Sequence, residues 1–239
     1  DWSWECAGVV DLEAGSLTVN LHDLTGFDAR CDAIYLSSNG AQPTDGTGPE
    51  SRAWRRRLRG IPDKPPVEGP YDVVFIGGGV TGSVGALAAA RLGLRVAVVQ
   101  NRPVLGGNAS IEIGIGPRGE KGSLVAEAIA RKPDGDLQVG QLLAAEPNAT
   151  IYLHHQVFDL EMNGRVVESI DAREARSGKE IRIVASQFVD CTGTAILGVL
   201  ADVPTMFGVE SSAEFGESLA PEERLDQHHG HTVFFRTRM

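Results

Sequence analysis

The stretch that most constrains the fold runs from residue 71 to residue 110, YDVVFIGGGVTGSVGALAAARLGLRVAVVQNRPVLGGNAS. Its first apolar run, residues 71–76, predicts a parallel strand that is buried on both faces. An alanine-rich helical segment follows, and residues 94–100 predict a second buried strand. Together they form a β-α-β unit of about 30 residues, so we expect an α/β protein with a Rossmann-type domain.

The turn between the first strand and the helix has the pattern G-x-G-x-x-G, formed by Gly77, Gly79 and Gly82. In this pattern the first glycine allows a tight turn, the second lets a pyrophosphate approach the backbone, and the third lets helix and strand pack closely. The helix N-terminus adds free N–H groups and the positive end of its dipole. We therefore expect these glycines to bind a dinucleotide; the alternative is a glycine-rich turn without a ligand.

The end of the second strand indicates which dinucleotide is bound. An acidic residue commonly binds the ribose hydroxyls there, but this chain has Gln100, followed by Asn101 and Arg102. The glutamine can accept a ribose O–H through its carbonyl, whereas the arginine would suit the 2′-phosphate of NADP. We assign all three residues to the adenosine ribose and the nearby phosphate, and these residues alone leave both cofactors open.

Three segments resemble one protein family: QNRPVLGGNAS at 100–110, VDCTG at 189–193 and FGESLAPE at 215–222. They are similar to FAD-dependent oxidoreductases with the glutathione-reductase type of nucleotide fold, in particular the branch related to the flavin subunit of heterodisulfide reductase. The resemblance spans most of the chain and implies FAD as the cofactor. It also implies roles for further residues: Gly106, Gly107, Asn108 and Ala109 line the path to the flavin, backbone at Val157 faces the adenine, and Thr192 and Gly193 flank the ligand.

This chain departs from the family pattern directly after Gly193. Relatives commonly continue with Asp-Gly, whereas this sequence has Thr194 and Ala195. The change removes a carboxylate that is often placed near the flavin.

The rest of this domain shows helical and strand patterns in turn. Apolar spacing predicts helices over 123–129 and 137–145. Strands are expected over 150–162, 166–173 and 181–185, with a hairpin at Asn163-Gly164, and residues 188–193 are expected to return to the parallel sheet. The antiparallel meander matches the insertion found in the resembled fold.

The chain is expected to have three parts. Residues 1–50 contain alternating runs at 16–22 and 33–37, which look like the last strands of a β-sandwich similar to carbohydrate-binding modules. Residues 51–70 form a basic, proline-rich linker. Residues 71–239 form the FAD-binding domain, which we expect to be incomplete at its C-terminus. Trp2 and Trp4 are expected in the sandwich core, with stacking on a sugar as the alternative.

Composition and charge narrow the possible partners. The net charge of −10 disfavours nucleic acid, and no apolar run approaches the length of a membrane span. Three scattered cysteines cannot hold an iron–sulfur cluster, and His228, His229 and His231 lack a fourth ligand at the spacing of a zinc motif. We therefore expect neither a metal nor a membrane anchor. Localisation, oligomeric state and catalytic residues are left unassigned.

These observations predict an FAD-dependent oxidoreductase that transfers hydride through the flavin, with a carbohydrate or another small molecule as substrate. Two other functions stay open at this point. One is an NADP-dependent oxidoreductase that uses Arg102. The other is a non-catalytic carbohydrate-binding or interaction protein.

Overall fold

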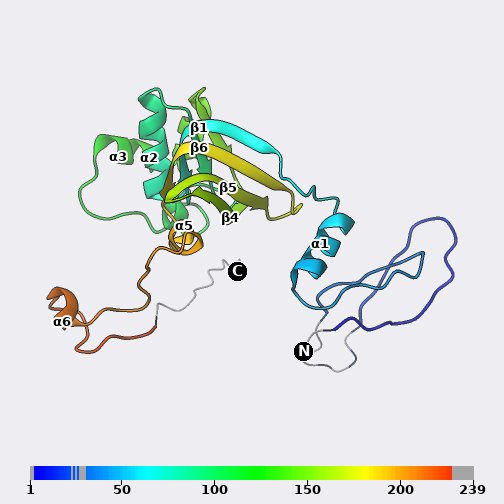
Figure 1. The fold of residues 1–239 in the computed structure, drawn as a ribbon. Coiled ribbons are helices and arrows are strands. Elements are labelled where there is room, and N and C mark those ends of the chain that lie inside the picture. The colour runs from blue at the N-terminus through cyan, green and yellow to red at the C-terminus, as the bar shows by residue number, and fades with distance from the viewer. Residues whose placement is uncertain (1–2, 23, 25, 27–30, 228–239) are drawn as a thin grey trace, which may run out of the picture. The chain divides into compact units, whose positions relative to one another are not determined.

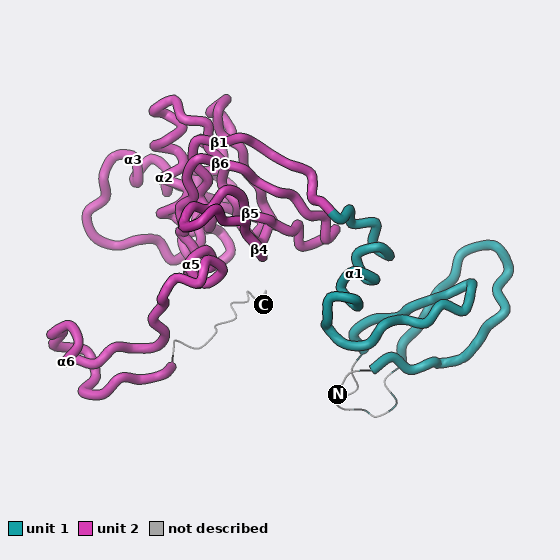
Figure 2. The backbone as a smooth tube through the Cα atoms, in the orientation of Figure 1, with its two compact units in different colours: residues 1–63 teal, residues 64–239 magenta. Residues whose placement is uncertain are grey.

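The computed structural model describes residues 3–22, 24, 26 and 31–227. Contacts divide the chain into two compact units, Asp1–Asp63 and Lys64–Met239 (Figure 2). The boundary falls inside the predicted linker. Each unit is described by itself below.

In the first unit, helix α1 (Pro49–Leu58) packs against the segments before it. Trp54 of this helix lies in an aromatic cluster with Trp4 and Tyr35, with ring centroids 5.0 to 6.3 Å apart. Ser51 is buried and donates a hydrogen bond to the Thr44 carbonyl at 3.2 Å. Trp4 is therefore a packing residue in this unit, while Trp2 lies outside the described residues.

The strands expected over 16–22 and 33–37 are not formed. The described residues from 3 to 48 contain neither strand nor helix, and Leu17, Val19 and Leu21 are 46%, 50% and 70% exposed. Alternation marks a surface that can pack, but a strand also needs a partner for its backbone N–H and C=O groups. No described segment pairs with either run, so the predicted β-sandwich is not seen.

The second unit is built on one six-stranded sheet with the order β3-β2-β1-β6-β5-β4 (Figure 1). Strands β3, β2, β1 and β6 are parallel to one another, and β5 and β4 extend the sheet beyond β6 in antiparallel pairing. The bounds are β1 Val67–Ile76, β2 Val96–Val99, β3 Ala149–Tyr152, β4 His155–Asn163, β5 Val166–Glu174 and β6 Glu180–Asp190.

Two apolar clusters make the core, one on each face of the parallel strands. The first packs α2 (Val80–Arg91), α3 (Ser123–Ala128) and α4 (Val139–Ala145) against the sheet. The second joins the opposite face to side chains of β4, β5 and α5 (Ile196–Leu200). Figure 1 shows α2 and α3 together on one side of the sheet. The short helices η1 (Gly107–Ala109) and α6 (Ser212–Phe215) complete the described elements.

Most local elements of the second unit confirm the sequence analysis. The β-α-β unit, the helices near 123–128 and 139–145 and the turn after Asn163 are all present, with Gly164 at a φ of 62°. The first strand begins at Val67, four residues before the predicted start, so part of the predicted linker is strand.

Two strand predictions were wrong. The run 150–162 is two strands, because Leu153 and His154 form a turn in which His154 has a φ of 59°. Its first half, β3, joins the parallel sheet beside β2. Conversely, the two strands expected at 181–185 and 188–193 are one strand, β6, which pairs with both β5 and β1.

Candidate functional site

A cavity of about 420 Å³ lies where the carboxyl ends of β1, β2 and β6 meet the start of α2. Ligands of open α/β sheets bind at this edge, and the volume falls within the roughly 300–1,000 Å³ of small-molecule pockets. Ten of the thirteen predicted cofactor residues line it: Gly77, Gly79, Gln100, Asn101, Arg102, Gly107, Asn108, Val157, Thr192 and Gly193.

The three predicted residues outside the lining are Gly82, Gly106 and Ala109. Gly82 packs instead against the turn, since a β-carbon there would overlap the Gly77 carbonyl oxygen. Gly106 donates its N–H to the Gly78 carbonyl at 2.7 Å, and Ala109 is buried in the core. These three residues pack behind the residues that line the cavity.

The first glycine turn is formed as the motif requires. Gly77 has a φ of 95°, and a β-carbon there would lie 2.7 Å from the Cys191 carbonyl group. Gly79 is the N-cap of α2 and has extended backbone, with no atom within 4 Å of a β-carbon placed on it. The space at Gly79 is therefore open, and the positive end of a twelve-residue helix adjoins it.

The side chain of Gln100 bonds to backbone. It is 5% exposed, its Oε1 accepts the Gly78 N–H at 2.9 Å, and its Nε2 donates to the Val104 carbonyl at 3.2 Å. This placement differs from the predicted ribose contact. The amide instead ties the first glycine turn to the loop after β2.

The second glycine loop lies directly against the first. A β-carbon on Gly107 would be 3.1 Å from the Cα atom of Gly79. Arg102 supports this loop, with its Nη2 3.5 Å from the Gly107 carbonyl oxygen and its Nε 2.5 Å from Oε2 of Glu112. Both glycine-rich segments thus line the same cavity.

Asp190 accepts hydrogen bonds from the turn after β6, whose residues Thr192 and Gly193 line the cavity. Its Oδ1 accepts hydrogen bonds from the N–H and Oγ1 of Thr192, at 2.9 and 2.7 Å, and its Oδ2 accepts the Leu197 N–H at 2.8 Å. Cys191 lines the cavity, and burial together with Asp190 raises the pKa of its thiol. A raised pKa leaves less of the thiol as the nucleophilic thiolate at neutral pH.

The lining suits an anionic ligand. The described residues that line the cavity include no carboxylate, and the one cation among them, Arg102, is paired with Glu112, which lies outside the lining. Open space at Gly79 and a helix N-terminus fit the pyrophosphate of FAD. The residues present therefore fit the adenosine diphosphate part of the cofactor that the resemblance implies.

Comparison with known families agrees with this geometry. A family model described as FAD dependent oxidoreductase matches residues 72–132 and 114–238, which is most of the chain. The chain belongs to this family. The cofactor of this family is FAD.

Individual relatives match the chain over shorter stretches. Urocanate reductase of Eggerthella lenta is 30% identical over 107 residues, 44% of this chain and 17% of that protein. Dihydrolipoyl dehydrogenase of Trypanosoma brucei brucei is 55% identical over 42 residues, 18% of this chain and 9% of that protein. The chain thus matches less than a fifth of the length of these relatives.

A solved structure of a geranylgeranyl bacteriochlorophyll reductase-like protein from Thermoplasma acidophilum is also similar. It is 18% identical, with a TM-score of 0.44, and the match covers 57% of this chain and 43% of that chain.

The cavity also has lining residues that the sequence analysis did not find. His155 and Gln156 line the cavity at the start of β4. The His155 backbone N–H donates to the Gln100 carbonyl at 2.9 Å, and its ring Nδ1 lies 2.7 Å from the Leu153 carbonyl oxygen. They were missed because the break between β3 and β4, which brings them to this edge, was not predicted.

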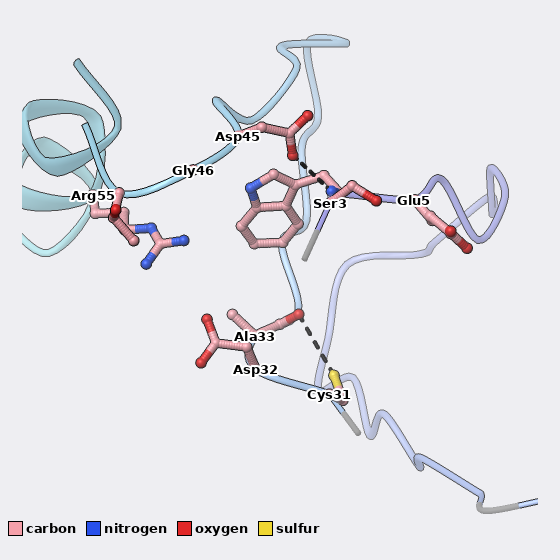
Figure 3. Close-up of a pocket in the computed structure, with 10 residues that line it drawn as sticks. Ser3, Glu5, Cys31, Asp32, Ala33, Asp45, Gly46 and Arg55 are labelled. Carbon is pink, nitrogen blue, oxygen red and sulfur yellow. Dashed lines mark hydrogen bonds between the residues drawn. The ribbon is translucent and has the colours of Figure 1, made fainter. Parts of the chain in front are cut away.

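A second cavity of about 730 Å³ lies in the first unit and is lined by residues such as Trp4, Asp32, Asp45 and Arg55 (Figure 3). The Trp4 backbone N–H donates to Asp45 at 2.7 Å, and its indole N–H donates to the Thr44 carbonyl at 3.2 Å. The indole is held by protein groups on its polar edge. This arrangement favours packing over sugar stacking.

None of the described helices is both long and apolar enough to span a membrane. The described part of the chain contains no cluster of three or more His, Cys, Asp or Glu suited to a metal ion; His228, His229 and His231 lie outside it.

Proposed function

We propose that the second unit binds the adenosine diphosphate half of FAD in the 420 Å³ cavity, and that the whole protein uses the flavin to transfer hydride to or from a small molecule. The observation that supports this most strongly is the convergence of ten predicted residues, drawn from four separate segments of the chain, on one cavity.

The cavity offers a separate position for each part of the ligand. Gly79 and the amino end of α2 suit the pyrophosphate, because the backbone there is uncovered and carries the positive end of the helix. Asn101 and Arg102 suit the adenosine ribose, and backbone near Val157 suits the adenine. When bound, FAD supplies hydride transfer at its N5 atom, while these residues hold and orient it.

The test is calorimetric titration of the 239-residue chain with ADP and, separately, with FAD. We expect ADP to bind at one site per chain and FAD to compete for it. A chain that binds neither ligand would contradict the proposal. The prediction of a carbohydrate substrate stays a prediction, because it depends on the upstream β-sandwich.

A further inference from the structure

The ion pair between Arg102 and Glu112 lies at the edge of the cavity. Among the described lining residues, Arg102 is the one with a full positive charge. Its Nε lies 2.5 Å from Oε2 of Glu112, and the two side chains are 31% and 32% exposed. Glu112 follows helix η1 and is ten residues away along the chain, so this pairing is a product of the fold.

The position of Gln100 makes this pair more important. Because the Gln100 amide bonds to the backbone of Gly78 and Val104, the guanidinium of Arg102 is the strongest polar group left near the end of β2. An unpaired guanidinium there would bind a phosphate through two parallel N–H bonds. Here its Nε is engaged and its charge is balanced by a carboxylate.

We propose that Glu112 is a selectivity residue of the nucleotide site: by neutralising Arg102, it makes the site reject a phosphate on the adenosine ribose. This inference rests on the proposed function, since it assumes that the ribose lies at the end of β2. A 2′-phosphate would meet the negative charge of Glu112 next to the guanidinium that should bind it. A ribose with free hydroxyls adds no such charge and is accepted.

The ion pair also contacts the second glycine loop. Nη2 of Arg102 lies 3.5 Å from the Gly107 carbonyl oxygen, and Gly107 packs on Gly79. Glu112 therefore holds the guanidinium against the second glycine loop. The variant Glu112→Gln keeps the shape and an acceptor oxygen but removes the charge. It therefore separates the effect of the Glu112 charge on phosphate binding from the effect of Glu112 on the position of Arg102.

The experiment compares AMP with adenosine 2′,5′-bisphosphate, which differ by the 2′-phosphate alone. Dissociation constants are measured by calorimetry for the wild-type chain, Glu112→Gln, Arg102→Met and the double variant. We expect the wild type to bind AMP more tightly. Glu112→Gln should shift the ratio of the two constants toward the bisphosphate by roughly five- to tenfold, because a partly exposed charge is partly screened.

The control is Glu120→Gln, which removes an equal charge from an exposed residue of the following loop and should leave the ratio unchanged. In the double variant the shift should disappear, because the gained affinity depends on the guanidinium. An unchanged ratio in Glu112→Gln, or an equal shift in Glu120→Gln, would overturn the inference while leaving the proposed function intact. Failure of the wild type to bind ADP or AMP would overturn both.

Discussion

A β-carbon on Gly82 would overlap the carbonyl oxygen of Gly77, whereas one on Gly79 would meet no atom within 4 Å. The two positions thus need glycine for different physical reasons. Gly82 is required by the packing of α2 on the preceding turn, so its replacement should harm the fold. No described atom lies close enough to require a glycine at position 79, so the proposed pyrophosphate gives the reason for it.

Gly79→Val should therefore abolish ADP binding while leaving the thermal midpoint within a few degrees of wild type. The added side chain occupies the open space where the pyrophosphate is proposed to lie, and the extended backbone of Gly79, with a φ of −65°, accepts a β-branched residue. Calorimetry and circular dichroism measure the two effects. Gly122→Val is the matched control, since Gly122 is also an extended N-cap in open space; a loss of ADP binding there as well would contradict the assignment.

Gln100→Glu should destabilise the second unit by about 1–3 kcal/mol at neutral pH. The change removes the N–H that Gln100 donates to the Val104 carbonyl and places a buried carboxylate beside that oxygen. Burial raises the pKa of such a carboxyl above its unfolded value, so the loss should be small in acid and grow as the pH rises through that range.

The measurement is urea unfolding of Gln100→Glu and wild type at pH 5 and pH 8. Gln187→Glu, on an exposed position of β6, controls for the added charge. A penalty that is equal at both pH values would show that the new carboxyl is not buried against Val104.

Asp190→Asn should cost about 1–3 kcal/mol of stability and weaken ADP binding. The carboxylate accepts from the backbone N–H groups of both Thr192 and Leu197, and an amide cannot accept at both oxygens because one becomes NH₂. Urea unfolding and ADP titration report the two losses, with the exposed Asp226→Asn as control. Normal ADP affinity in a destabilised Asp190→Asn would separate this turn from the ligand site.

Ala195→Gly should stabilise the second unit by about 0.5–1 kcal/mol. Ala195 has a φ of 49° and a ψ of 43°, a left-handed conformation that costs an alanine roughly 1–2 kcal/mol and a glycine much less. Glycine is also the residue expected there from the resembled family. The reverse sign is expected for Ala126→Gly within helix α3, and a destabilised Ala195→Gly would show that other contacts compensate the strain.

Sequence reasoning succeeded where the signal is local. The glycine motif, the apolar strands beside it and the Asn163-Gly164 turn each depend on a few neighbouring residues, and each is present. Reasoning failed where pairing decides. The break at His154 has no glycine or proline to mark it, and the runs at 16–22 and 33–37 have the alternation of strands but no described partner.

The sequence identified most of the residues that line the cavity, but it did not identify what each side chain contacts there. Backbone positions such as Gly77 and Thr192 line one cavity because each follows the end of a parallel strand, while their role in binding the cofactor stays a prediction. The Gln100 amide was assigned to the ribose because it stands at the strand end where an acidic residue commonly binds the ribose. Its bonds to Gly78 and Val104 give no periodic signal in the sequence. Asp190 and His155 were missed for a similar reason, since their contacts depend on how loops return to the sheet.

Strand β6 has a consequence for how this domain can change. It pairs with β5 on one edge and with β1 on the other, and the turn that follows it closes the cavity. A one-residue insertion or deletion within its eleven residues would turn alternate side chains to the wrong face and displace that turn at the same time. The meander of β4, β5 and β6 therefore cannot be exchanged or removed as a separate module unless β6 keeps its register. Extra residues can be accepted at the hairpin tip, Asn163-Gly164, because they would not reach the cavity.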